Sequence, residues 1–299
     1  MASGASRINV REILLFLAVA FGPCWLLAGA FRLTGLAWGS LPSQMLGVVY
    51  MFGPLLAVVV VQKWVRQEPV FEPMGVTFEF NRWWLVAWLA PVAAVMATLG
   101  VSLFLPGVRF SPEMAGVFER IQRLVPPERL EQMKAGMRLL PVHPFWFLLG
   151  AGLAAGPTSN ALVGFGEEVG WRGFLQRELA PLGFWRSSFL IGAMWGIWHA
   201  PLVLQGHNYP QHPALGAGMM TVWCMLMSPL FAFVRLKAKS VIPAAIMHGT
   251  INAVAGLAFG AVEGGNDLMV GLSGLSGFIV LAVANLLLLA ARPGRAEAG

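Results

Sequence analysis

Residues 83–105 read WWLVAWLAPVAAVMATLGVSLFL, an apolar run without a single charged side chain. An α-helix needs about 20 mostly apolar residues to cross the hydrocarbon core of a bilayer, and this run is long enough. A helix at the surface of a soluble protein would instead carry polar side chains on its water-facing side. The run therefore predicts a transmembrane helix, and it decides the class of fold.

Apolar runs of similar length recur on both sides of this one. They lie at residues 13–31, 45–62, 143–165, 187–204, 214–234, 241–262 and 270–291. The first follows Arg7 and Arg11 as a signal peptide would, but its apolar region of about 19 residues exceeds the usual range of about 7–15. We therefore predict an uncleaved first span and an all-α integral membrane protein with about eight transmembrane helices.

The composition supports a lipid environment for the whole chain. Of 299 residues, 57% are hydrophobic and only 11% are charged, whereas about a quarter of the residues in a soluble protein are charged. These values exclude a soluble enzyme and a disordered protein. The net charge of +6 does not indicate a nucleic-acid partner, because the 20 Lys and Arg are spread over short segments between apolar runs. The predicted partner is the lipid bilayer, and the sequence carries no prediction of oligomeric state.

The distribution of Lys and Arg predicts the orientation, because cytoplasmic loops carry an excess of these residues. With the N-terminus inside, 13 of the 20 fall on the cytoplasmic side: Arg7, Arg11, Lys63, Arg66, Arg82, Arg172, Arg177, Arg186, Arg235, Lys237, Lys239, Arg292 and Arg295. The long segment 106–142 carries six on the opposite side, which we explain by an amphipathic helix that lies on the membrane between Met114 and Leu140. We expect a multi-pass protein of the plasma membrane with both termini in the cytoplasm.

The predicted spans divide the chain into three regions. Residues 1–142 hold three spans and the amphipathic interfacial segment 106–142, residues 143–262 form a helical core, and residues 263–299 form the last span and a cytoplasmic tail. Inside the core, the stretch GPTSN at 156–160 interrupts an apolar run. Interrupted helices occur in membranes where they are buried in protein or line a cavity, so a site is expected here.

The first polar cluster is the stretch GEEVGWRG at 166–173. Glu168 and Arg172 are four residues apart, so they meet on one face of a helix and can form an ion pair. Glu167 points elsewhere and has no such partner in the sequence, which leaves its carboxylate free to act. A charged turn at the cytoplasmic membrane surface is the competing interpretation.

Two further clusters place histidines inside predicted spans. His199 follows Trp195 by one helical turn, and Trp195 would form an apolar wall beside the imidazole. His248 and Asn252 project from one face of a later span, where both can donate hydrogen bonds to a developing oxyanion. Hydrogen-bonded packing between helices is the competing explanation for both clusters.

The order of these motifs resembles the CPBP family of CAAX proteases and bacteriocin-processing enzymes, also called the type II CAAX prenyl endopeptidase or abortive-infection family. The motifs are Glu167-Glu168-x-x-x-Arg172, an aromatic-x-x-x-His at 195–199, and His248-x-x-x-Asn252. The resemblance covers roughly residues 145–258. The second family motif usually begins with phenylalanine, and Trp195 in its place alters the size of the pocket wall.

The resemblance implies an intramembrane endopeptidase that depends on glutamate and not on a metal. By position, Glu167 and His199 would activate a water, while His248 and Asn252 would stabilise the tetrahedral oxyanion. The neighbouring ion pair would hold the helix that bears Glu167. The substrate would be a peptide or protein at the membrane, with a prenylated protein or a bacteriocin-type peptide as candidates.

Three alternatives stay open from the residues themselves. Glu167, His199 and His248 are a legitimate ligand set for zinc, although we favour a site without any cofactor. The same polar residues could line the path of a small-molecule transporter, but no repeat relates residues 1–140 to 141–299. A non-catalytic immunity protein or membrane chaperone could bind a peptide in the same cavity.

The remaining acidic residues and histidines limit the catalytic mechanisms that the chain could use. Asp267 is the only aspartate, which excludes a protease that needs two aspartates. His207 and His212 fall in the polar stretch QGHNYPQHP at 205–213, which we interpret as an ordinary loop on the outer side.

Overall fold

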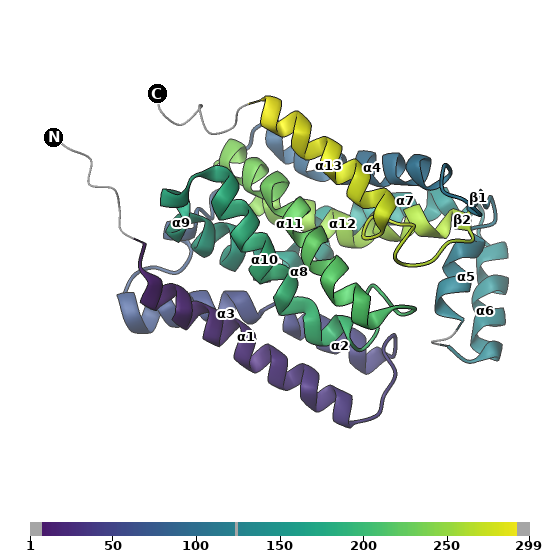
Figure 1. Ribbon diagram of the computed structural model, residues 1–299, viewed down its shortest axis with the longest axis horizontal. Coiled ribbons are helices and arrows are strands. Elements are labelled where there is room, and N and C mark those ends of the chain that lie inside the picture. The colour runs from purple at the N-terminus through teal and green to yellow at the C-terminus, as the bar shows by residue number, and fades with distance from the viewer. Residues whose placement is uncertain (1–7, 123–124, 292–299) are drawn as a thin grey trace.

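The computed structural model of the chain describes residues 8–122 and 125–291, and these are mostly helical (Figure 1). The helices are α1 (Val10–Leu33), α2 (Leu41–Tyr50), α3 (Gly53–Val59), α4 (Arg82–Ser102), α5 (Ala115–Ile121), α6 (Pro127–Arg138), α7 (Pro144–Ala155), α8 (Ala161–Glu168), α9 (Gln176–Glu178), α10 (Phe184–Val203), α11 (Pro213–Ala238), α12 (Ile242–Gly260) and α13 (Leu275–Ala290). Wider π-helical turns at Val60–Arg66, Gly156–Asn160 and Val169–Leu175 continue α3, α7 and α8, and 3₁₀ turns form at Glu72–Met74 and Ala180–Leu182. Two short strands, β1 (Arg109–Phe110) and β2 (Val262–Glu263), pair antiparallel.

Within residues 8–122 and 125–291, five helical segments are long and apolar enough to cross a membrane. They are Val10–Leu33, Leu41–Arg66, Arg82–Ser102, Pro213–Ala238 and Ile242–Gly260. Each coincides with one of the predicted apolar runs, so the prediction of an α-helical, multi-pass integral membrane protein is confirmed.

The predicted number of eight spans is not confirmed, because the other three runs do not form helices that are both long enough and apolar enough to count as spans. The run at 143–165 is interrupted by the π-helical turn at 156–160, as its GPTSN stretch indicated. α13 has only 16 residues, and α10 has 20 but includes Arg186 and His199. A membrane-spanning role for these three segments stays a prediction.

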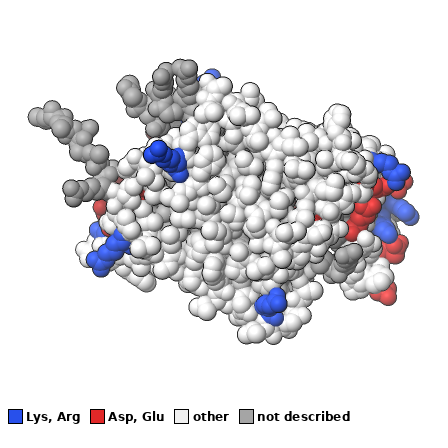
Figure 2. Space-filling view, in the orientation of Figure 1, with Lys and Arg blue, Asp and Glu red and all other residues white. Residues whose placement is uncertain are grey.

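The outer surface carries the apolar side chains that lipid would contact. Leu26 in α1 and Leu287 in α13 are 76% and 69% exposed, although neither could lie in water without cost. Figure 2 shows that most charged side chains of the visible face gather at the two ends of the molecule, with a broad uncharged band between them. This distribution fits a molecule whose middle lies in lipid and whose ends meet water.

The segment 106–142 differs from its prediction as one amphipathic helix. It contains β1, α5 and α6, and the two helices lie side by side at one end of the molecule (Figure 1). Pro126 and Pro127 explain the break, because proline lacks a backbone N–H and clashes within a helix. α5 packs against α12 and β2, whereas α6 buries none of its residues.

α12 is the central helix, and it packs against α4, α7, α8 and α11. Two thirds of its span is buried, the largest share among the five spans. Gly249 permits this packing, because a Cβ atom there would overlap the backbone of Gly156 and Ala161. The close approach brings His248, on α12, to the helix that carries Glu167.

The loops gather at two opposite ends of the molecule. At the end where α1 begins and α13 finishes, which we call the terminal end, Arg177 donates to the carbonyl of Pro73 and the Val241 amide donates to that of Gly75 (Figure 1). At the other end, which we call the loop end, segments 34–40, 204–212 and 261–274 lie together. Trp38 contacts His207 edge to face there, with ring centres 5.2 Å apart, and Tyr209 donates to the Ser273 carbonyl over 2.7 Å.

Candidate active site

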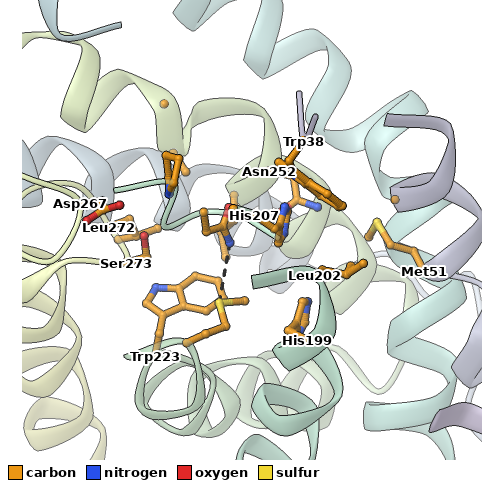
Figure 3. Close-up of a pocket in the computed structure, with 18 of the residues that line it drawn as sticks. Trp38, Met51, His199, Leu202, His207, Trp223, Asn252, Asp267, Leu272 and Ser273 are labelled. Atoms are coloured by element: carbon orange, nitrogen blue, oxygen red, sulfur yellow. Dashed lines mark hydrogen bonds between the residues drawn. The ribbon is translucent and has the colours of Figure 1, made fainter. Parts of the chain in front are cut away.

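A cavity of about 580 Å³ lies inside the helical bundle and extends to the loop end. Its walls come from α2, α5, α8, α10, α11 and α12 and from the loops 34–40, 204–212 and 261–274. The polar side chains among its lining residues include Glu167, Trp195, His199, His207, Asn208, His248, Asn252, Asp267 and Ser273. Figure 3 shows several of these side chains from separate elements pointing toward one space. All four side chains that the motifs single out for catalysis line this cavity.

Glu167 lies at the inner end of the cavity and is almost completely buried, with 1% of its surface exposed. Its Oε2 accepts hydrogen bonds from the indole N–H groups of Trp171, at 3.2 Å, and Trp195, at 2.6 Å. The prediction of an unpartnered carboxylate is therefore wrong, because two tryptophans hold it. Both indole hydrogen bonds go to Oε2, and the Nε2 atom of His248 lies 3.9 Å from Oε1.

Glu168 and Arg172 form the ion pair that their spacing predicted. The Nη1 atom of Arg172 lies 3.1 Å from both carboxylate oxygens, and both side chains are buried. The guanidinium group lies between the rings of Trp195 and Phe231, 4.5 and 4.4 Å from their centres. Such cation–π contacts stabilise a desolvated guanidinium. Arg172 is therefore an interior residue, and its earlier assignment to the cytoplasmic surface is wrong.

His248 connects the two adjacent glutamates. Its Nδ1 atom lies 2.7 Å from Oε1 of Glu168, and a carboxylate oxygen there can accept the Nδ1 proton. Its Nε2 atom therefore points to the Glu167 side of the cavity. The ring is fixed in this orientation by the hydrogen bond and by edge contact with Phe231, whose ring centre lies 5.9 Å away.

His199 is oriented by its own helix. Its Nδ1 atom lies 2.8 Å from the backbone carbonyl oxygen of Trp195, and a carbonyl can only accept, so Nδ1 carries a proton. In the neutral imidazole, Nε2 then holds a free lone pair and can act as a base. Trp195 packs beside the ring with its centre 5.8 Å away, in agreement with the predicted aromatic wall.

Asn252 lies one helical turn beyond His248 on α12 and is exposed to the cavity. Within the part of the chain that the structure describes, no residue forms a hydrogen bond with its amide. Figure 3 shows the Asn252 side chain on the cavity side of the helix. An amide with free donors at this position can bind an oxygen atom of a ligand.

His207 lines the cavity, although its polar stretch predicted only an ordinary loop. Its ring lies parallel to that of His199, with the ring centres 6.3 Å apart (Figure 3). The loop that carries it is held by Asp267, which accepts hydrogen bonds from the Gln211 amide at 2.6 Å and from Nδ1 of His212 at 2.6 Å. No local pattern links residues 55 positions apart, so only the tertiary structure reveals this arrangement.

The pKa of His207 gives this arrangement a testable consequence. The cavity walls shield the imidazole from water and lower its pKa from 6.5 to about 4. Between these values the unfolded chain binds more protons than the folded protein, so the free energy of unfolding decreases as the pH falls from 7 to 4. At pH 5 this loss amounts to at most about 2 kcal/mol. We expect His207→Gln to show a smaller decrease than the wild type when thermal unfolding is compared at pH 7 and pH 5, and parallel curves for the two proteins would contradict this.

The described residues contain no group of three or more His, Cys, Asp and Glu side chains that is arranged to hold a metal ion. Glu167 and His248 approach each other, but His199 hydrogen-bonds a backbone carbonyl through Nδ1. The zinc alternative therefore has no preformed ligand cluster in its favour.

These features define a class of protein, a helical membrane protein with a buried glutamate, two histidines and an asparagine around a cavity among its helices. Residues 142–254 match a family model described as Type II CAAX prenyl endopeptidase Rce1-like. The matched segment contains all three motifs, and this similarity supports the resemblance to the CPBP family, a family of membrane proteases. The match covers less than half of the chain, and no curated protein matches the sequence.

Proposed function

We propose that this protein is an intramembrane endopeptidase of the glutamate-dependent type, which hydrolyses a peptide bond with a water activated at Glu167. The observation that carries the proposal is the convergence of Glu167, His199, His248 and Asn252 on one cavity. These side chains come from three helices, α8, α10 and α12. Ionisable groups inside a membrane protein are costly and commonly mark a functional site.

Charge balance supports an ionised Glu167 as the base. Four ionisable side chains are buried together, namely Glu167, Glu168, Arg172 and His248. With both glutamates ionised and both Arg172 and His248 protonated, their charges sum to zero, which limits the cost of burial. In this state Glu167 can accept the proton of an attacking water, and the lone pair of His199 Nε2 offers a second acceptor across the cavity.

The same state supplies the groups that would stabilise the tetrahedral intermediate. A protonated His248 donates from Nδ1 to Glu168 and keeps a second proton on Nε2, which faces the cavity. The amide of Asn252 adds a donor one helical turn away. Two donors aimed at the developing oxyanion would lower the barrier to amide hydrolysis, and the proton on Glu167 would then pass to the leaving amine.

The shape of the cavity favours a peptide with an apolar group. Beyond Asn252, the α12 wall continues through Ala255, Gly256 and Phe259, while Gly47 of α2 and Met51, which follows that helix, also line the cavity. A volume of about 580 Å³ suits a few residues of a peptide together with an apolar side chain or lipid. We propose a membrane-bound peptide or protein substrate, lipidated or not, and a plasma-membrane enzyme with both termini in the cytoplasm.

The proposal is tested with purified protein in detergent and a fluorescence-quenched peptide that ends in a CAAX sequence. The peptide is supplied with and without an S-farnesyl group, and wild type is compared with Glu167→Gln. We expect cleavage by the wild type alone. Equal turnover by the two proteins would contradict the assigned role of Glu167.

The metal-independent mechanism has its own test. We expect the rate of cleavage to remain unchanged after incubation with EDTA and 1,10-phenanthroline, and we expect elemental analysis to find less than one zinc per chain. Loss of activity that added zinc restores would instead support Glu167, His199 and His248 as zinc ligands.

A further inference from the structure

The cavity has an inner end and an outer end that differ in position along the molecule. The inner end is formed by Glu167, Trp195 and His248, deep in the bundle. The outer end is formed by residues of the loop-end segments 34–40, 204–212 and 261–274, together with Ile121 of α5. A substrate therefore reaches Glu167 from the loop end and not from the terminal end.

Three of the four segments around the outer end of the cavity carry no cation. Segments 34–40, 204–212 and 261–274 contain no Lys or Arg, and the last contains Glu263 and Asp267. Short loops without Lys and Arg are typical of the side of a membrane protein that faces away from the cytoplasm.

The terminal end is rich in cations by comparison. Segments that meet there carry Lys63, Arg66, Arg82, Arg177, Arg186, Lys237 and Lys239. Hydrogen bonds join these segments, since Thr77 donates to the Lys239 carbonyl and Arg66 pairs with Glu178 at 2.9 Å. The structure thus places cations that are distant in sequence on one end of the molecule, which the positive-inside rule assigns to the cytoplasm.

One segment at the loop end does carry cations. Segment 106–142 contains six Lys and Arg, so with Arg32 the loop end carries seven of the 20 in the chain. The cytoplasmic side is predicted to carry 12 once the buried Arg172 is left out, and the excess of Lys and Arg therefore still lies at the terminal end. Four glutamates, Glu113, Glu119, Glu128 and Glu131, lie in the same segment. Outside this segment, the sequence places one further cation, Arg32, at the loop end.

We infer that the cavity opens on the extracytoplasmic side of the membrane, so that the substrate is a peptide segment that has crossed the membrane and not the cytoplasmic C-terminal tail of a protein. That the cavity takes a peptide substrate rests on the proposed function. The direction in which the cavity opens rests only on the position of the cavity and on the distribution of Lys and Arg. The apolar part of the cavity would then guide the substrate, since a segment anchored in the outer leaflet would reach Glu167 along α12.

Cysteine accessibility tests the direction of opening without any need for activity. The native Cys24 and Cys224 are buried, with 4% and 0% exposure, so the wild type serves as the unlabelled blank. Ala37→Cys and Ala180→Cys are a matched pair, because both alanines are exposed and lie at the loop end and the terminal end. Spheroplasts of a bacterial expression host are treated with a sulfonated, membrane-impermeant maleimide, before and after detergent permeabilisation.

We expect Ala37→Cys to react fully in intact spheroplasts and Ala180→Cys to react only after detergent. The reverse pattern, or equal reaction of both in intact spheroplasts, would overturn the inference. A second arm adds a membrane-impermeant quenched peptide to the outside of spheroplasts with wild type or Glu167→Gln. If the two cysteines are labelled as expected but the wild type cleaves no peptide in spheroplasts or in detergent, only the proposed function is contradicted. If the labelling is reversed and the wild type cleaves the peptide in detergent, only the direction of opening is contradicted.

Discussion

Glu167→Gln is expected to lower kcat for peptide cleavage by at least about 1,000-fold, because an amide cannot accept the proton of the attacking water. The substitution should leave the fold intact. Trp171 and Trp195 both donate to Oε2, and a glutamine carbonyl oxygen can accept both hydrogen bonds. The measurement is single-turnover cleavage of the quenched peptide by purified protein, with thermal unfolding recorded in the same detergent.

Glu131→Gln is the matched control for this substitution. Glu131 lies on α6, 70% exposed and outside the cavity, so the same loss of charge should leave kcat unchanged. A Glu167→Gln protein that unfolds like the wild type and still cleaves at the wild-type rate would refute the role of Glu167 as base. Peptide binding by both proteins without cleavage by either would favour the non-catalytic immunity or chaperone alternative.

Arg172→Met is expected to destabilise the protein by about 3–5 kcal/mol, the largest stability effect that the structure indicates. The substitution keeps an apolar side chain between Trp195 and Phe231, so the packing changes little. It removes the cation that faces both carboxylate oxygens of Glu168, which is fully buried. Glu168 then keeps only His248 as a partner, and the buried cluster gains one net negative charge. The free energy of unfolding is measured in mixed detergent micelles.

A double variant separates the buried charge from the lost contact. Arg172→Met combined with Glu168→Gln should be less destabilised than the sum of the two single variants, because each single variant leaves one charge unpaired. The exposed pair Lys134–Glu131 offers a control, and Glu131→Gln should change the free energy of unfolding far less than either buried substitution, because water screens an exposed ion pair. Additive effects of the two buried substitutions would show that the ion pair does not couple them.

The membrane-spanning helices were largely predictable, because the hydropathy of a span is the average over residues that follow one another in the sequence. The run at 83–105 forms α4, and the GPTSN stretch does interrupt the helix between α7 and α8. The prediction was less accurate for segment 106–142, where Pro126 and Pro127 divide the helix. It was also incomplete for α13, since the last apolar run begins as a turn and not as a helix.

The candidate site was predictable in its residues but not in its connections. The spacing of Glu168 and Arg172 predicted their ion pair, because an i, i+4 contact is set by the geometry of one helix. The spacing of residues in the sequence could not reveal that Trp195 donates a hydrogen bond to Glu167 or that His248 is hydrogen-bonded to Glu168. These contacts join different helices. The same reason explains why His207 looked like part of an ordinary loop.

The sequence by itself determined that this chain lies in lipid and which few polar side chains lie within its apolar stretches, because both properties depend on local composition. Only the tertiary structure decided which of these side chains meet. The packing of Gly249 against α8 brings His248 to two glutamates, and the hydrogen bond from His212 to Asp267 holds the loop that carries His207 over the cavity. The end of the molecule at which that cavity opens is likewise a property of packed helices, because it depends on contacts between residues that are far apart in the chain.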